Sequence, residues 1–307
     1  MRAGDVRTAQ SGGVVLVTGV TGFLGWQLVP ALSAAGFQPV GTIHRHRPDP
    51  PPCPVHNLDL NDFRAGEALL RRLAPAAVIH AAAAVSPAWC ERHPAAARRL
   101  NRDATAALAR AAAARGCRFV FTSTDRVFAG DQAWYREQDA PAPLGVYGAS
   151  KVAGEEAVLA ASPENIVVRL PLMYGPPSPW HESFLGWMLR AFREKSELGL
   201  FLDQYRTPAL VGDVAGGIVA LLAGLVPGGI YHLGGEERVN RAEFGYAFCA
   251  AAGRDPGLIR PVLMSEKADL PPTPFDVSLN SDKLAAAVSW RCRGIRAGLR
   301  EFAGRRQ

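Results

Sequence analysis

Residues 14–25 read Val-Val-Leu-Val-Thr-Gly-Val-Thr-Gly-Phe-Leu-Gly, the most informative segment of the chain. Its apolar, β-branched beginning predicts a strand, the glycines that follow predict a tight turn, and a helical apolar pattern starts at Leu24. A strand, a glycine-rich turn and a helix N-terminus hold the pyrophosphate of a dinucleotide, because backbone N–H groups and the helix dipole favour an anion. The expected contacts are Gly19, Thr21, Gly22, Phe23, Leu24 and Gly25. The spacing is G-x-x-G-x-x-G rather than G-x-G-x-x-G, so this segment alone leaves an ordinary tight turn open.

Strand-like and helix-like segments alternate over the first half of the chain. Strands are expected at 14–18, 39–44, 76–80, 118–123 and 166–170, and helices at 24–35, 62–73, 95–115 and 147–160. This alternation predicts βαβ units with right-handed crossovers, and hence an α/β fold with a Rossmann-type, doubly wound parallel sheet. After Pro171 strands and helices no longer alternate regularly. Helices are expected at 181–194, 211–224, 241–252 and 297–302, and a strand at 229–233.

The looser second half predicts a smaller, mixed α/β lobe over the carboxyl ends of the parallel strands, where open α/β sheets bind their ligands. We expect a flexible tail at 1–13 and a dinucleotide-binding Rossmann domain at 14–170, to which 206–233 returns. The remaining segments, 171–205 and 234–307, form the expected substrate-binding lobe.

Bulk properties narrow the class of protein. The 307 residues contain no apolar run long enough to span a membrane, and the polar N-terminus lacks the apolar core of a signal peptide, so we expect a cytoplasmic protein. The five cysteines are scattered without metal-ligand spacing, which predicts reduced thiols and no metal. The net charge of +6 comes from dispersed arginines rather than a basic stripe, which favours a small anionic ligand over nucleic acid.

The end of the second expected strand indicates which dinucleotide is bound. His44, Arg45 and Arg47 lie there, with no acidic residue nearby, and Arg45 is twenty residues past Gly25. An acidic residue at this place takes the ribose 2′-hydroxyl of NAD, whereas arginine accommodates the 2′-phosphate of NADP. We therefore expect NADP(H), with NAD(H) as the alternative. The other possibility is that these basic residues form a solvated loop that binds no cofactor.

Two further segments are candidates for the cofactor pocket. Asp59, beside Leu60, either accepts from the adenine amino group or caps the following helix, and these two roles stay open. Ala81, Ala82 and Ala83 follow a short buried strand, and their small side chains allow either close approach of a flat ligand or plain core packing.

The candidate chemistry lies at Ser123-Thr124-Asp125 and at Tyr147-Gly148-Ala149-Ser150-Lys151. Tyr147 and Lys151 are spaced i, i+4 and share one helix face. An ammonium about 4 Å from a phenol lowers the phenol pKa by about 3 units at an effective dielectric near 20, so we expect Tyr147 to titrate near neutrality. Tyr147 then donates a proton to a carbonyl oxygen that receives a hydride, and Thr124 or Ser123 donates a second hydrogen bond.

Together these motifs resemble the extended short-chain dehydrogenase/reductases, and within them the dTDP-4-dehydrorhamnose reductase branch. The branch motifs are Cys90-Glu91-x-x-Pro94, Asn101, Ser123-Thr124-Asp125-x-Val127-Phe128-x-Gly130, Tyr147-Gly148 and Arg206-Thr207-Pro208. The chain is also similar to the regulatory subunit of methionine adenosyltransferase. The resemblance implies Thr124, Tyr147 and Lys151 as the catalytic triad, and Asn101 as organiser of the helix and of a proton-relay water. The expected cofactor contacts then also include Leu60, Asn101, Ser123, Tyr147, Lys151 and Pro171.

Departures from the reductase pattern fall in the expected substrate region. Arg126 stands where the reductases have Tyr, and Pro271-Pro272 where they have Arg-Pro. Sugar-nucleotide dehydratases carry a Glu base at the position of Arg126, and a guanidinium cannot act as that base, so dehydration is disfavoured. The expected substrate contacts are Val85, Asp125, Arg126, Tyr174 and Arg206.

Three functions follow from this pattern. The first is an NADPH-dependent reductase of a keto group, such as that of a nucleotide-linked 4-keto-6-deoxysugar. The second is a sugar-nucleotide epimerase, which the basic end at Arg45 disfavours. The third is a non-catalytic NADP-binding regulatory subunit, which an intact Tyr147 and Lys151 do not exclude. Both a homodimer, common in this superfamily, and a monomer stay open.

Overall fold

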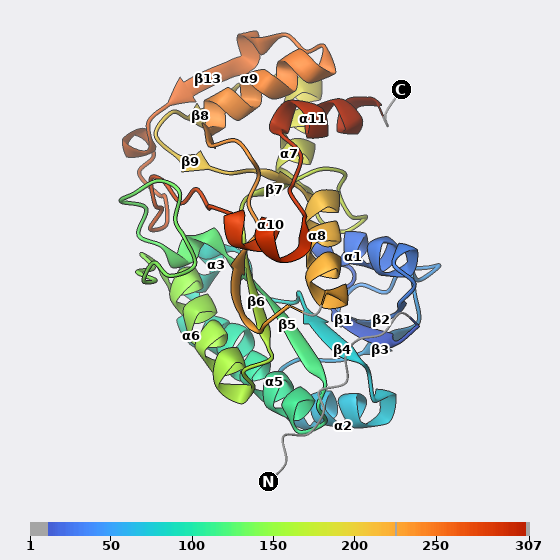
Figure 1. Cartoon of the computed structure of the whole chain (residues 1–307). Coiled ribbons are helices and arrows are strands. Elements are labelled where there is room, and N and C mark those ends of the chain that lie inside the picture. Colours follow the sequence, from blue (N-terminus) through green and yellow to red (C-terminus); the bar gives the residue numbers. More distant parts are fainter. Residues whose placement is uncertain (1–11, 225, 305–307) are drawn as a thin grey trace.

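The computed structural model describes residues 12–224 and 226–304, so the expected tail at 1–13 lies almost wholly outside the described residues. Its centre is a seven-stranded parallel sheet with the strand order β11-β6-β5-β4-β1-β2-β3 (Figure 1). The strands are β1 (Val14–Thr18), β2 (Gln38–Ile43), β3 (Val55–Asn57), β4 (Ala77–His80), β5 (Arg118–Thr124), β6 (Ile166–Leu170) and β11 (Gly229–His232). The chain thus has the doubly wound α/β sheet that the alternating pattern predicts.

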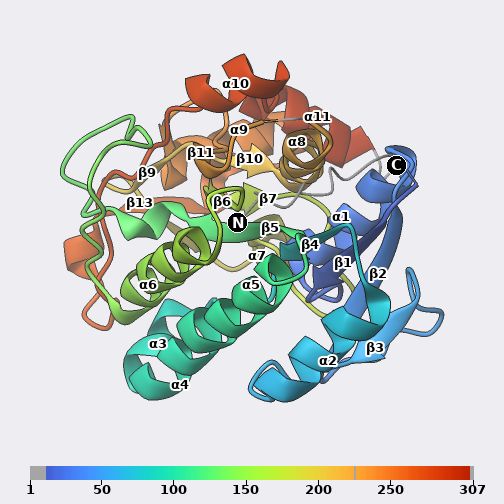
Figure 2. The same ribbon diagram turned by 60° about the horizontal axis from the view of Figure 1, so that its bottom comes forward.

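Helices cover both faces of this sheet (Figure 2). One face carries α1 (Phe23–Ala34) and α8 (Val211–Ala223), and the other carries α2 (Phe63–Leu73), α5 (Thr105–Ala113) and α6 (Val146–Ala161). Alternate residues of one strand therefore enter different cores: Val15 and Val17 pack on the α1 side, whereas Leu16 packs on the α5 side. Burial on both faces explains the continuous apolar runs of these strands.

The strand order reverses at β1. The chain moves from β1 to β2 and β3 on one side, and then to β4, β5 and β6 on the other. The loops that leave β1 and β4 therefore diverge at the carboxyl edge of the sheet, where doubly wound folds bind ligands.

A smaller lobe lies above this edge (Figure 1). Its helices α7 (Phe184–Glu194), α9 (Arg241–Ala252) and α11 (Ile295–Gly304) share a separate apolar core with β8 (Leu198–Phe201) and β13 (Ile259–Val262). Short strand pairs join the lobes: β7 (Met173–Tyr174) with β10 (Ala209–Leu210), and β9 (Tyr205–Arg206) with β12 (Val239–Asn240). The remaining helix of this half, α10 (Asp282–Val288), packs on α8 and β11.

The prediction of one regular α-helix over 95–115 is wrong. The segment contains α4 (Pro94–Arg98), a π-helical segment (Arg99–Ala104) and α5, and a separate helix α3 (Pro87–Arg92) precedes it. Its start is set by Pro94 at the first turn of α4, and its end by Gly116, whose φ of +61° suits glycine. In the described part of the chain, no helix is both long and apolar enough to cross a membrane.

Candidate active site

The glycine-rich turn after β1 is shaped as a cradle. Gly19 adopts a φ of +73°, and a Cβ at Gly25 would lie 2.1 Å from the carbonyl oxygen of Gly19. Gly22 is the N-cap of α1 and offers no side chain to its first N–H groups, and no acidic residue lies in the first turn. The turn thus leaves backbone donors at a positive helix end, which suits a pyrophosphate.

The 2′-phosphate end expected of NADP lies at the carboxyl end of β2. His44, Arg45 and Arg47 are exposed there, as is His46 between them. A loop of the small lobe approaches this end, where Trp180 stacks on His46 with ring centroids 6.1 Å apart. The same loop contacts the glycine-rich turn, because the Ser178 hydroxyl donates to the carbonyl of Thr21 at 3.0 Å. The basic residues at this end therefore fit a dinucleotide whose ribose carries a 2′-phosphate.

The other cofactor candidates lie along the same edge. Ala82 abuts Gly19, where an added Cβ would come within 3.0 Å of it, so the alanines after β4 border the glycine-rich turn. Asp59 is exposed, and its carboxylate accepts from the backbone and side chain of Asn61 at 2.9 and 3.1 Å. The cap of α2 is Asp62 rather than Asp59. Asp59 as an adenine contact stays a prediction, and so do Leu60 and Pro171 at this edge.

Thr124 and Tyr147 meet at the end of β5. Thr124 ends the strand, and its hydroxyl donates to Asp125 Oδ1 at 3.2 Å. The Thr124 and Tyr147 side chains are hydrogen-bonded to each other, which partly opposes the rise that burial causes in the Tyr147 pKa. Tyr147, in the first turn of α6, lines a narrow crevice together with Arg126 and Pro272. Ser123 Oγ is buried there and has no hydrogen-bond partner in the part of the chain that the structure describes.

The expectation that Tyr147 titrates near neutrality is wrong for the free protein. Burial raises the Tyr147 pKa to about 12, and the hydrogen bond to Thr124 only partly opposes this. Burial lowers the pKa of Lys151 to about 7, against an opposing effect of Glu155 one turn further along α6. The Lys151 Nζ lies 3.9 Å from the centroid of the Phe121 ring. Desolvation is thus the largest influence on the pKa values of both groups.

Two side chains from outside α6 fix its position. Val146 N–H, at the start of α6, donates to Glu91 Oε1 at 2.7 Å. Asn101, in the π-helical segment, donates to Ser150 Oγ at 2.9 Å and pairs with both backbone groups of Ala84. These contacts hold the Tyr147 turn against the loop that follows β4.

Charged groups crowd the side of the site that faces the small lobe. Asp125 is buried, and its Oδ2 lies 3.4 Å from Nε of buried Arg206. Arg126 reaches Pro272 O at 2.8 Å and Thr273 Oγ1 at 3.2 Å. Burial raises the pKa of Asp125 and lowers the pKa values of Arg206 and Arg241 to about 10 and about 9. Arg206 Nη2 and Arg241 Nη1 are buried and have no hydrogen-bond partner among the described residues.

Three guanidiniums therefore lie around Asp125. A second carboxylate, Asp276, also acts on Arg206 but is itself paired with Arg238 at 2.6 Å, so this part of the site carries an excess of positive charge. Sequence patterns identified Arg126 and Arg206 but missed Arg241. Arg241 is simply the first residue of α9, and only the tertiary fold brings it to Asp125, so no sequence signal marked it.

The remaining substrate candidates lie elsewhere. Val85 is exposed on the loop after β4. Tyr174 is 0 % exposed and packs edge-on against Phe244 in the core of the small lobe. The expectation that Tyr174 contacts a substrate is wrong for this structure, because its side chain has no accessible surface.

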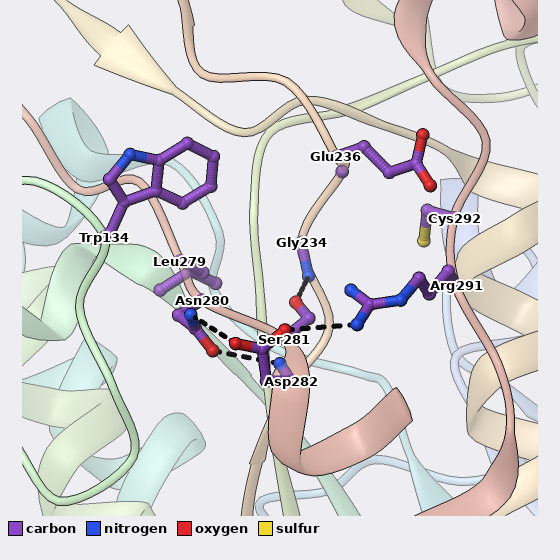
Figure 3. A pocket seen from close by; sticks show the side chains of 10 residues that line it. Trp134, Gly234, Glu236, Leu279, Asn280, Ser281, Asp282, Arg291 and Cys292 are labelled. Atoms are coloured by element: carbon purple, nitrogen blue, oxygen red, sulfur yellow. Dashed lines mark hydrogen bonds and ion pairs between the residues drawn. The ribbon is translucent and has the colours of Figure 1, made fainter. Parts of the chain in front are cut away.

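A second cavity, of about 470 Å³, lies beside α10 and the loop after β11 (Figure 3). Two of its lining residues bind the same carboxylate: Arg291 donates to Asp282 at 3.1 Å, and Asn280 donates to Asp282 at 3.0 Å. None of the predicted site residues is among those described as lining it. The predicted catalytic residues lie instead at the end of β5 and in the first turns of α6.

A Rossmann-type sheet, a glycine cradle and a Thr-Tyr-Lys site are features of the short-chain dehydrogenase/reductase class. The chain matches the model of the family described as RmlD substrate binding domain over residues 13–307, and it belongs to that family.

Named relatives of two kinds are similar to the chain. It is 33% identical over 253 residues to the probable low-salt glycan biosynthesis reductase Agl14 of Haloferax volcanii, covering 81% of this chain and 84% of that protein. It is 32% identical over 295 residues to methionine adenosyltransferase 2 subunit beta of Pongo abelii, covering 94% and 86%. The fold matches a crystal structure of dTDP-4-dehydrorhamnose reductase from Bacillus anthracis in complex with NADP, with a TM-score of 0.84, 25% identity and coverage of 95% and 98%.

Proposed function

We propose that the protein is an NADPH-dependent reductase of a keto group on a nucleotide-linked sugar, with a 4-keto-6-deoxysugar as the favoured substrate. The observation that carries the proposal is the hydrogen-bonded pair of Thr124 and Tyr147 at the carboxyl edge of the sheet, with Lys151 one turn further along the helix of Tyr147.

NADPH, when bound, supplies the hydride. Gly19, Gly22 and Gly25 would hold its pyrophosphate, and Arg45 and Arg47 its 2′-phosphate. The similar reductase from Bacillus anthracis was solved in complex with NADP, which supports this cofactor. The basic end of β2 also favours NADPH over NAD, and hence reduction over the transient oxidation of an epimerase.

Three side chains supply the proton and stabilise the charges that develop during the reaction. The raised pKa of Tyr147 keeps the phenol protonated at neutral pH, so it can donate its proton to the carbonyl oxygen. The single hydroxyl proton of Thr124, which is donated to Asp125 in the free protein, turns to the substrate and gives that oxygen a second hydrogen bond. Protonated Lys151 stabilises the phenolate that forms.

The surplus of arginine supports a substrate with a negative charge. A buried cation that is not neutralised is costly, and here the carboxylates of Asp125 and Asp276 are shared among four guanidiniums, those of Arg126, Arg206, Arg238 and Arg241. A diphosphate between sugar and nucleoside would supply the missing charge at Arg206 and Arg241, whose unpartnered nitrogens lie within this cluster.

A regulatory subunit is the second candidate, favoured by the 32% identity to methionine adenosyltransferase 2 subunit beta over 94% of the chain. One experiment separates the two functions. NADPH oxidation is followed with a panel of nucleotide-linked keto sugars, and the same preparation is used to capture partner proteins. Turnover with a keto sugar supports the reductase. NADPH binding without turnover, together with capture of a partner enzyme, contradicts it.

A further inference from the structure

A chain of buried hydrogen bonds runs beneath the proposed active site. It begins at Thr18, the last residue before the glycine-rich turn, whose Oγ1 lies 2.7 Å from His80 Nδ1. The other ring nitrogen, His80 Nε2, lies 3.1 Å from Thr105 Oγ1. The Thr105 hydroxyl in turn donates to the backbone carbonyl of Asn101 at 2.9 Å. All four residues are at most 1 % exposed, so water does not compete for these contacts.

The chain continues into the helix that carries Tyr147. The Asn101 side chain donates to Ser150 Oγ, and the Ser150 hydroxyl donates to the backbone carbonyl of Tyr147 at 2.7 Å. The Thr18 hydroxyl oxygen also accepts from the N–H groups of Ala81 and Ala82, both at 3.1 Å. His80 therefore stands between the strand end that precedes the cofactor cradle and the segment that supports Tyr147.

The donors and acceptors determine the state of the His80 ring. A hydroxyl has one proton, and that of Thr105 is donated to Asn101, so Thr105 Oγ1 must accept from His80 Nε2–H. His80 Nδ1 then carries a lone pair and accepts from the Thr18 hydroxyl, whose oxygen already accepts from two N–H groups.

The surroundings keep this ring neutral. Burial, aided by the charge of Lys151, lowers the pKa of His80 to about 3. The ring also stacks on Phe121, with centroids 5.8 Å apart and planes 20° apart, which is the same phenylalanine that lies under the Lys151 ammonium. A second positive charge beside Lys151 is thereby avoided.

We propose that His80 is a positioning residue that holds the glycine-rich turn and the Tyr147 helix in register, acting as a neutral bridge with its proton on Nε2. One nitrogen fixes Thr18 and the cofactor side, and the other fixes Thr105 and, through Asn101, the Tyr147 side. The kinetic part of this inference rests on the proposed reductase function; the structural part does not.

The first test needs no substrate. The ring nitrogens of His80 are observed by ¹⁵N NMR in the whole protein with NADPH bound. The expected spectrum shows a protonated Nε2 and an unprotonated Nδ1, with no titration between pH 5 and pH 9. A proton on Nδ1, or a charged ring in this range, overturns the bridge.

The second test separates the two halves of the bridge. In His80→Asn the amide reaches the place of Nδ1 but not Thr105, whereas in His80→Gln it reaches the place of Nε2 but not Thr18. We expect His80→Gln to raise the Kd for NADPH about tenfold. We expect His80→Asn to leave that Kd within about twofold and to lower kcat about tenfold, since a small misplacement of Tyr147 is enough.

A matched control is His232→Asn, because His232 is also fully buried and its pKa is also lowered to about 3. This variant is expected to lower the free energy of unfolding, but not to change the Kd for NADPH or kcat selectively. If both His80 variants change Kd and kcat alike, or behave like His232→Asn, the positioning role is overturned. If the protein reduces no keto sugar, hydrogen exchange of the 146–151 amides replaces kcat: faster exchange in His80→Asn supports the bridge, and unchanged exchange overturns it.

Discussion

Glu91 Oε1 accepts the backbone N–H of Val146 at 2.7 Å, and so caps the helix that carries Tyr147 and Lys151 from a different helix, α3. The N-cap residue of α6 itself is Gly145, which has no side chain to do this. A carboxylate at this place satisfies an orphan donor and also faces the positive end of the helix dipole.

We therefore expect Glu91→Ala to lower the free energy of unfolding by about 1 kcal/mol, the usual cost of a lost cap. Glu91→Gln keeps an acceptor oxygen and should cost only about 0.5 kcal/mol. Because the freed turn holds Tyr147, kcat should fall more in Glu91→Ala than in Glu91→Gln. Urea denaturation and steady-state kinetics measure both effects. Equal stability and kcat in the wild type and in Glu91→Ala would show that the cap is not needed.

Lys151 sets the expected pH dependence. Its pKa is lowered to about 7, so the ammonium is present below pH 7 and is lost as the pH rises through that value. Tyr147, with a pKa near 12, stays protonated throughout this range. The kcat/KM for keto reduction should thus be level below pH 7 and decline above it, because the stabilising charge beside the phenolate disappears.

Lys151→Met should lower kcat/KM about 100-fold at pH 6 and remove the decline above pH 7. The same lysine lowers stability while it is charged and buried. The unfolded chain binds this proton up to about pH 10.5, so stability should increase from pH 7 toward pH 10 in the wild type but not through this group in Lys151→Met. A pH–rate profile that is identical in both proteins would contradict the assignment.

The arginine cluster makes a separate prediction about the substrate. Arg206→Met and Arg241→Met each remove one charge from the group around Asp125, and each should raise the KM for a diphosphate-linked keto sugar at least about tenfold, the scale of a lost charged hydrogen bond. The Kd for NADPH should not change, because these residues lie on the small-lobe side of the site. Arg190→Met, in an exposed ion pair with Glu182, is the control. A KM that is unaffected by both cluster variants would exclude the cluster from substrate binding.

The buried ion pair of Glu155, one turn after Lys151 on α6, should contribute to the free energy of unfolding. Arg169 and Glu155 are 1% and 3% exposed and bond at 2.8 Å. Glu155→Gln should lower the free energy of unfolding by about 3–5 kcal/mol, because Arg169 would remain buried without its partner. The exposed pair Arg190–Glu182 has the same distance, 2.8 Å, and Glu182→Gln should cost less than about 1 kcal/mol. Chemical denaturation compares the two, and similar losses would refute the role of burial.

The parallel strands were the most predictable part of the fold. The runs 14–18 and 166–170 are apolar except for Thr18 and Arg169, and they coincide with β1 and β6 as observed. The two-residue strands β7, β9, β10 and β12 were not predicted, because they form only where distant segments meet. The π-helical turn at Arg99–Ala104 also has no signature in an alanine-rich helix.

The site residues likewise divide into those predictable from the regular elements and those that depend on the tertiary fold. Thr124 and Tyr147 lie at the ends of regular elements, so their proximity follows from sheet order. Tyr174 lies in a two-residue strand, and sequence did not show that its side chain points into the small-lobe core. The pKa of Tyr147 was mispredicted because attraction to Lys151 was considered without the cost of burying both groups.

Hydride transfer itself tests the central claim most directly. The protein is mixed with NADPH deuterated at the transferable position of the nicotinamide and with a dTDP-linked 4-keto-6-deoxysugar, and the sugar is analysed by mass spectrometry and NMR. We predict one deuterium on the former carbonyl carbon in the wild type, and incorporation at least about 100-fold slower in Tyr147→Phe at an unchanged Kd for NADPH. A wild-type protein that binds both molecules but transfers no deuterium would contradict the assignment as a reductase.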